Sequence, residues 1–283
     1  MKDIKTEITN KIIKLMETHG SNWVKPFSSL HGTPVNSLTA KSYRGMNSLW
    51  LGLQGQMYWA TYKQWQELDA QVMKGSKSSM IAVPMQIKDK KTEEVTGIYF
   101  RCASVFSPDQ VDGWEAPTVD TPDQTEILKN VDSYISKIGA DVRHSTSGRA
   151  FYNPSNDFIQ MPERNQFTKT KTSTATECYY STLLHEHVHY TGHKSRLNRL
   201  ELKNKKGYAF EELIAETGAA MLCATLNISP EVRADHSQYL ANWLKVLTKE
   251  NGNDYIWKAA NEAQKAVDYL NAGGRELNES LTQ

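Results

Sequence analysis

Two histidines four positions apart, with a glutamate directly after the first, constrain this chain more than any other feature. They are His185 and His189, and Glu186 lies between them. On a helix, residues four positions apart project from the same face, so both imidazoles can bind one metal ion. Histidine is rare here, at 8 of 283 residues, and the segment around the motif is apolar, as expected of a buried helix. We therefore predict a helix at about 172–191 that carries a metal site.

Glu186 is placed to act as the general base of a metal-dependent hydrolase. Neutral imidazoles bind Zn²⁺, the ion lowers the pKa of water, and a neighbouring carboxylate can then accept the proton. This is the chemistry of a zinc metallopeptidase. Because the imidazoles must be neutral to bind the ion, we expect the metal to be lost below about pH 5–6. Two histidines and a carboxylate also accept Mn²⁺, Co²⁺ or Ni²⁺, so the motif leaves the metal species open.

A catalytic zinc ion needs a third protein ligand, and a second predicted helix, at about 208–226, offers two candidates. Glu212 and Glu216 stand four positions apart among apolar and small residues. A carboxylate on so apolar a helix is costly to bury unless it meets a cation. We favour Glu216 as the ligand, with Glu212 as the alternative or as a partner that orients a histidine.

Two further histidines are weaker candidates for the metal site. His193 follows Gly192, which is expected to end the helix, and His187 faces another side of the helix. We expect His187 to have a structural or outer-shell role. The small residues from Gly218 onward should let the second helix pack closely against the first.

The rest of the pattern predicts an α+β protein with two domains. We place a small α+β domain at 1–115 and a mostly helical domain with a short sheet at 121–283, with a linker between Ser107 and Pro122. Periodicity, caps and turn residues predict the following elements. The helices are 3–18, 61–68, 121–138, 172–191, 208–226, 229–250 and 253–271, and the strands are 80–88, 97–106, 141–144, 150–153 and 157–161.

Charge is distributed unevenly along the chain. Residues 1–110 hold 14 Lys and Arg against 9 Asp and Glu, a balance of +5, and residues 111–283 hold 19 against 23, a balance of −4. A basic part joined to an acidic part suggests two units with different partners, although a chance fluctuation of solvated charges gives the same totals. No apolar run of about 18 residues and no signal-like N-terminus is present, so we expect no membrane partner and a cytoplasmic location.

Several motifs taken together resemble ArdC-type antirestriction proteins. In the first half, the matching positions are 23–27, 36, 41–47, 59–64 and 74–75. In the second half, they are 151–152, 157–159, 161–162, 185–199 and 212–222. Each N-terminal motif is weak alone, but their order and spacing make the combined match specific.

The resemblance implies an N-terminal domain that binds single-stranded DNA and a C-terminal zincin-like metallopeptidase domain. It also implies carriage by a plasmid or phage and protection of incoming DNA from host restriction, with a restriction-modification protein or another peptide as a possible substrate. The family pattern assigns His185, His189 and one glutamate of the Glu212/Glu216 pair to the metal, and Glu186 to catalysis. Zincin peptidases pair the substrate backbone with a strand, for which 157–161 is the candidate.

Single-stranded DNA is bound by cationic side chains that meet phosphates and by aromatic faces that stack on bases. The first domain interleaves both kinds of residue, although each aromatic taken singly is more often part of a core. The candidate DNA-binding residues are Lys25, Lys41, Tyr43, Arg44, Lys63, Lys74 and Lys77.

Two other functions fit the same sequence. The chain can be a non-catalytic protein that binds DNA or a restriction enzyme and holds a structural metal, or it can be a regulatory metalloprotease that cleaves a repressor. Glu186→Gln separates catalysis from binding, because it removes the base but keeps both imidazoles. A protease of the second kind needs no affinity for oligonucleotides.

Overall fold

The computed structural model describes residues 4–89, 92–118, 123–200, 205–230 and 253–275. The first half contains α1 (Ile4–His19), η1 (Gly20–Ser29), β1 (Val35–Asn36), α2 (Gly45–Gly52), β2 (Tyr58–Thr61), α3 (Tyr62–Glu67), β3 (Gln71–Val72), β4 (Ser79–Lys88), β5 (Val95–Phe106), η2 (Pro108–Gln110) and β6 (Val111–Asp112). The second half contains α4 (Gln124–Ile138), β7 (Asp141–Ser145), β8 (Phe151–Asn153), β9 (Phe158–Pro162), η3 (Arg164–Gln166), α5 (Ala175–Thr191), α6 (Lys205–Thr225) and α8 (Asn253–Asn271). The mixture of helices and strands confirms the α+β class. Residues 231–250 of the helix predicted at 229–250 lie outside the described residues.

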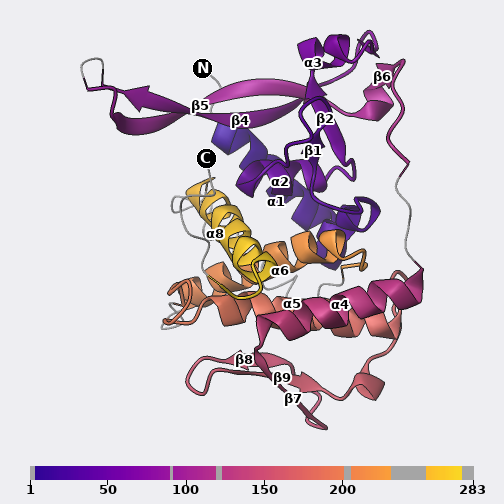
Figure 1. The fold of residues 1–283 in the computed structure, drawn as a ribbon, viewed down its shortest axis with the longest axis vertical. Helices are drawn as coiled ribbons and strands as arrows, with labels where there is room; N and C mark the ends of the chain where they lie inside the picture. Colours follow the sequence, from indigo (N-terminus) through magenta and orange to yellow (C-terminus); the bar gives the residue numbers. More distant parts are fainter. Residues whose placement is uncertain (1–3, 90–91, 119–122, 201–204, 231–252, 276–283) are drawn as a thin grey trace.

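The elements are stacked in layers from the top to the bottom of Figure 1. A sheet with the order β1-β2-β5-β4 lies uppermost. Helices α1 and α2 lie below it, followed by α6 and α8, and then by α4 and α5. A three-stranded sheet with the order β7-β9-β8 forms the lowest layer. The helical layers therefore separate the two sheets.

The strands predicted at 80–88 and 97–106 are β4 and β5, and they form an antiparallel hairpin. The pairing of β4 with β5 runs from Ser79↔Val105 to Lys88↔Val95. Val105 and Ile81, at the inner end, are buried, whereas Ile98 at the outer end is 61% exposed. Figure 1 shows this outer end extending beyond the rest of the upper layer.

Helix ends follow the capping residues in the sequence. The predicted helix 61–68 is α3, and the Thr61 side chain accepts a hydrogen bond from the Gln64 backbone N–H. The helix predicted from Thr121 starts at Gln124 instead, because the Asp123 side chain accepts hydrogen bonds from the first free N–H groups. It ends as predicted at Gly139, whose φ of 71° favours glycine.

The predicted linker between Ser107 and Pro122 is only partly a linker. Its first residues form η2 and β6, and β6 pairs with β3 through Val72↔Val111. Val111 is 8% exposed and packs in a small core with Trp65 and Ala60. Because Val111 is buried in this way, the segment that contains it packs against the first half of the chain. The prediction that residues 108–112 belong to a linker is therefore wrong.

The described residues up to 118, called the upper region, and those from 123 onward, called the lower region, share one hydrophobic core. Helices α1 and α2 pack against α8, and η1 packs against α6. Lys25, on η1, donates hydrogen bonds to Ser173 Oγ at 3.1 Å and to the Pro230 carbonyl at 2.8 Å. The boundary between 1–115 and 121–283 stays a prediction. In the part of the chain that the structure describes, no helix combines the length and apolarity needed to cross a membrane.

Candidate metal centre

Helices α5 and α6 bring the predicted site residues together because they pack closely. A capping box starts α5, in which the Thr174 side chain accepts from the Glu177 N–H and the Glu177 carboxylate accepts from the Thr174 N–H. Where the two helices meet, a Cβ atom on Gly218 would lie 2.9 Å from Val188 Cγ2. Glycine is therefore needed for this approach, as the small residues of α6 predicted.

Three side-chain donors converge between the two helices. His185 Nε2 and His189 Nε2 are 3.1 Å apart. The Glu212 carboxylate reaches both with different oxygens, since Oε2 lies 3.4 Å from His185 Nε2 and Oε1 lies 3.7 Å from His189 Nε2. Two ligands of a tetrahedral zinc ion lie about 3.3 Å from each other, so the three donor atoms fit one ion. Among the described residues, His185, His189 and Glu212 form the group of potential ligands whose donor atoms lie within 4.8 Å of one another.

The remaining ring nitrogens face two other glutamates. His189 Nδ1 donates to Glu211 Oε1 at 3.1 Å, and His185 Nδ1 lies 3.5 Å from Glu216 Oε1. A carboxylate on Nδ1 fixes the tautomer in which Nε2 is free to bind an ion. The geometry thus favours Glu212, the alternative of the sequence analysis, over Glu216 as the third ligand. The sequence could not decide between them, because the choice depends on how the two helices cross.

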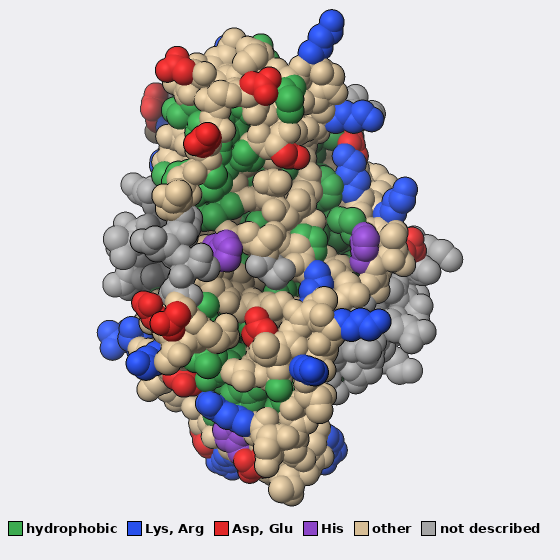
Figure 2. Space-filling view, turned by 90° about the vertical axis from the view of Figure 1, so that its right-hand side faces the viewer, with side chains coloured by type: hydrophobic (Ala, Val, Ile, Leu, Met, Phe, Trp, Pro, Cys, Tyr) green, Lys and Arg blue, Asp and Glu red, His purple; other side chains and the backbone are tan. Residues whose placement is uncertain are grey.

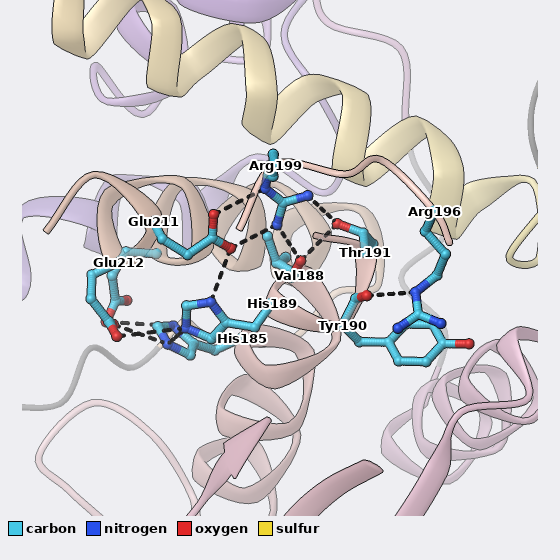
Figure 3. Close-up of polar contacts among 10 residues, drawn as sticks. His185, Val188, His189, Tyr190, Thr191, Arg196, Arg199, Glu211 and Glu212 are labelled. Carbon is cyan, nitrogen blue, oxygen red and sulfur yellow. Dashed lines mark hydrogen bonds and ion pairs between the residues drawn. The ribbon is translucent and has the colours of Figure 1, made fainter. Parts of the chain in front are cut away.

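Arg199 holds Glu211 in place and was not expected to belong to the site (Figure 3). Its guanidinium donates to Glu211 Oε1 at 2.9 Å and to Oε2 at 3.1 Å. It also donates to the Thr191 hydroxyl and to the Val188 carbonyl near the end of α5. Side-chain exposure is 7% for Arg199 and 3% for Glu211. The sequence held two signals for this pair: Arg199 is within the family match at 185–199, and Glu211 is the first of two adjacent acids on an apolar helix.

The charges of the centre call for a divalent cation. Glu211, Glu212 and Glu216 are each at most 4% exposed, and Arg199 pairs with Glu211. Buried carboxylates are costly unless they meet positive charge, and a divalent cation at the three donor atoms would supply two such charges. Without an ion, protons take its place. Burial alone would lower the pKa of His185, but Glu216 and Glu212 outweigh it and raise that pKa well above the usual 6.5.

His189 behaves in the same way. Burial lowers its pKa, while the hydrogen bond to Glu211 and the charge of Glu212 raise it, and the net pKa is raised. Both imidazoles therefore sit among carboxylates that favour a positive charge, whether it comes from protons or from a metal ion.

The other predicted residues of the motif helix take distinct positions. Glu186 is buried, at 4% exposure. His187 is fully buried and donates from Nδ1 to the Leu183 carbonyl at 2.7 Å, and burial lowers its pKa to about 4. His193 lies beyond α5, where Nδ1 contacts Ser195 Oγ at 2.7 Å. The structure brings neither His187 nor His193 into the ligand group.

Arg196 ties the lower sheet to the end of α5. It pairs with Asp157, donates to the Tyr190 carbonyl at 2.6 Å, and stacks over the Tyr190 ring at 3.5 Å from its centre. Hydrogen bonds from Arg196 lower the pKa of Asp157 to about 2. The strand predicted at 157–161 is β9, and it has β7 on one side and β8 on the other. It therefore has no free edge for a substrate, and the open edges of this sheet belong to β7 and β8.

The candidate DNA-binding residues divide into exposed and engaged side chains. Lys25 is bonded to Ser173 and Pro230, as described above. Tyr43 is half-buried, and its hydroxyl contacts Asn36 and the Trp59 carbonyl. The exposed ones are Lys41, Arg44, Lys63, Lys74 and Lys77. Figure 2 shows several Lys and Arg side chains along one edge of its upper half, beside exposed hydrophobic side chains.

Comparison with known proteins covers nearly the whole chain. Residues 2–127 match the N-terminal domain of the anti-restriction factor ArdC. Residues 129–262 match a family of zincin-like metallopeptidases, MPTase-PolyVal. The Mn(II)-bound crystal structure of the antirestriction protein ArdC from plasmid R388 is 36% identical, with a TM-score of 0.78 over 98% of this chain and 100% of that chain. The chain belongs to the ArdC antirestriction family.

Further matches include two chains of similar length and two longer proteins. The metal-free structure of the R388 protein has a TM-score of 0.73 at 36% identity over 96% of this chain and 98% of that one. The uncharacterized protein y4eC of Sinorhizobium fredii is 36% identical over 95% of this chain and 92% of its own length. Two Escherichia coli proteins named DNA primase TraC are 31% and 32% identical, and the chain spans only 28% and 19% of their lengths.

These comparisons agree with the geometry of the centre on one coarse point. A zincin-like domain, an Mn(II)-bound relative and a group of two imidazoles and a carboxylate together point to a divalent metal.

Proposed function

We propose that this ArdC-family protein protects incoming plasmid or phage DNA from host restriction, that its upper region binds single-stranded DNA, and that its lower region is a zinc-dependent peptidase. The observation that carries the peptidase proposal is the convergence of His185 Nε2, His189 Nε2 and Glu212 on one point. Glu211 and Glu216 on the opposite ring nitrogens support it, because outer carboxylates of this kind orient metal-binding histidines.

Each residue of the centre has a role in the proposed hydrolysis. His185, His189 and Glu212 hold the divalent cation, and Glu211 and Glu216 keep the two imidazoles oriented. The bound cation would polarise the scissile carbonyl and acidify the attacking water. Glu186 accepts a proton from that water as its oxygen bonds to the carbonyl carbon. When the C–N bond breaks, Glu186 passes this proton to the leaving amine, so that a carboxylic acid and an amine result, and the acid then loses its remaining proton to solvent.

Metal analysis and cleavage assays on the same samples test this assignment. Glu186→Gln should retain the metal and lose cleavage of an unfolded casein or of restriction-modification subunits by about 10²–10⁴-fold. Glu126→Gln, which changes an exposed glutamate on α4, is the matched control. Wild-type protein that holds no divalent metal, or that is no more active than Glu186→Gln, would refute the peptidase proposal. Protection of transferred DNA that survives in Glu186→Gln would show that protection comes from binding.

The proposal of DNA binding rests on the upper region. It is supported by the ArdC N-terminal match, by the names of the TraC relatives, and by the basic charge of residues 1–110. Exposed lysines and arginines are suited to phosphates. Fluorescence anisotropy with labelled oligothymidine should detect binding that weakens as salt increases. Binding equal to that of an unrelated acidic protein would refute this half of the proposal.

A further inference from the structure

A groove between the upper and lower regions has the shape of a ligand site. It has a volume of about 650 Å³ and lies where residues 41–47, β4, β5 and α8 meet. Pockets of roughly 300–1,000 Å³ hold small organic ligands. Phe100, from β5, and Trp257, from α8, both line it. Because both regions contribute walls, neither region forms the groove alone.

The aromatic side chains of the groove offer a stacking surface. Phe100 is 44% exposed, while Trp257 is 6% exposed. The two rings meet edge to face, with their centres 6.2 Å apart. Trp257 therefore supports the Phe100 ring, and Lys5 Nζ lies over both rings, at 5.9 Å from the centre of Phe100 and 5.8 Å from that of Trp257. The exposed part of the Phe100 ring can stack on a planar ligand.

Cationic side chains surround this aromatic surface. Lys41 and Arg44 come from the upper region and Lys265 from α8, and all three line the groove. Arg44 and Lys265 keep 59% and 61% of their side chains exposed, and Lys265 pairs with Glu262 one turn earlier on α8, at 2.7 Å. One acid also lines the groove, since Asp268 on α8 pairs with Arg44. The groove thus combines three cations and one carboxylate with an open aromatic ring.

Two elements that border the groove, α2 and α8, contact each other at Gly45, the first residue of α2. Its N–H donates to Gln264 Oε1 at 3.0 Å, and its φ is 53°. A Cβ atom there would lie 2.4 Å from Asn261 Oδ1. Glycine therefore lets α2 touch α8 directly, which fixes the distance between the cations of the two regions.

We infer that this groove binds single-stranded DNA, with one base stacked on Phe100 and the neighbouring phosphates at Lys41, Arg44 and Lys265. The inference rests on the proposed DNA binding and gives it a place that includes α8. Stacking on an aromatic ring with cations around it is how proteins bind single strands without reading sequence. A duplex keeps its bases stacked on one another and offers no base face to a ring inside a groove. Asp268 opposes binding, because a phosphate has to displace it from Arg44.

Anisotropy titration with labelled oligothymidine tests the stacking contact. Phe100→Ala should weaken binding by at least about 5-fold. Ile98→Ala is the matched control, because Ile98 lies two residues away on the same face of β5, is 61% exposed and does not line the groove. Its affinity should stay within about 2-fold of wild type. Equal melting temperatures of the two variants verify folding, and equal affinities would overturn the inference.

A variant that binds oligothymidine more tightly than wild type gives a second test, because misfolding would not increase affinity. Asp268→Asn removes the competing charge with little change in shape, so it should tighten binding by about 3-fold and make it more sensitive to salt. Unchanged affinity would count against the groove.

Photocrosslinking locates the strand directly. Oligothymidine that carries 5-iododeoxyuridine should crosslink to peptides from residues 41–47, 95–106 or 253–271. Crosslinks confined to the region of Lys63, Lys74 and Lys77 would place the DNA elsewhere and overturn the inference, while the proposed function would stand. A wild-type protein that binds no single-stranded DNA at all would overturn both.

Discussion

The metal centre and the groove differ in how far their ion pairs are exposed to solvent. Arg199 and Glu211 pair at 7% and 3% side-chain exposure, and their partners are protein groups. Arg44 and Asp268 pair at 59% and 20% exposure, where water and solutes can compete. The first arrangement holds rings in one orientation for a small ion, and the second leaves a cation available to a large anion. The following predictions test this contrast.

The largest difference should appear when each ion pair is broken. Arg199→Met leaves Glu211 buried without its cation and should destabilise the fold by about 3–5 kcal/mol. Arg44→Met should cost less than about 1 kcal/mol, because exposed pairs contribute little. Urea unfolding monitored by circular dichroism measures both. The double variant Arg199→Met/Glu211→Gln should recover part of the lost free energy of unfolding. Equal destabilisation by Arg199→Met and Arg44→Met would contradict the proposed difference between the two sites.

Metal affinity should distinguish the ligand from the orienting glutamate. Glu212→Gln removes a donor and should weaken Zn²⁺ binding by more than about 100-fold, while Glu216→Gln should weaken it by about 10–100-fold. Competition with a chromogenic chelator gives both constants. The reverse order would restore Glu216 as the ligand and make Glu212 the orienting residue.

Acid should release the metal earlier than the motif alone suggested. In the metal-free protein the carboxylates raise the pKa of His185 and His189 above 6.5, so protons compete with the ion already above that pH. Apparent affinity should therefore fall by about tenfold or more per pH unit as the pH drops from about 8 to 6. Chelator competition at several pH values measures this, and constant affinity over that range would contradict it.

The smallest predicted effect concerns Lys25, whose ammonium joins the two regions. Lys25→Met should lower stability by about 1 kcal/mol, because charged hydrogen bonds to Ser173 and Pro230 are lost. Its affinity for oligothymidine should match that of wild type, whereas Lys41→Met should bind more weakly. If Lys25→Met lost affinity for oligothymidine without losing stability, Lys25 would contact DNA, as the sequence predicted.

The sequence predicted best what depends on short spacings. The pairing of His185 with His189, the cap at Thr61 and the β4–β5 hairpin are set by neighbouring residues, and the structure has all three. Contacts between distant segments were not predictable in this way. Ser173 is 148 positions from Lys25, and no local pattern indicates that they meet.

The same limit applies to the role of Arg199. Its basic side chain gave no sign of burial, because Arg199 lies in the loop after α5 and the acid that stabilises it lies on α6. Which of Glu211, Glu212 and Glu216 meets which ring nitrogen likewise follows from the packing of Gly218 on Val188.

The shared core has a consequence for anyone who cuts this protein into pieces. A truncated chain that ends before α4 keeps α1 and α2 but loses α8, on which both pack. The faces of α1 and α2 that pack on α8 would then be exposed to water, and such a fragment is expected to aggregate. We therefore expect the first half to depend on α8, and its activity is best measured in the intact polypeptide.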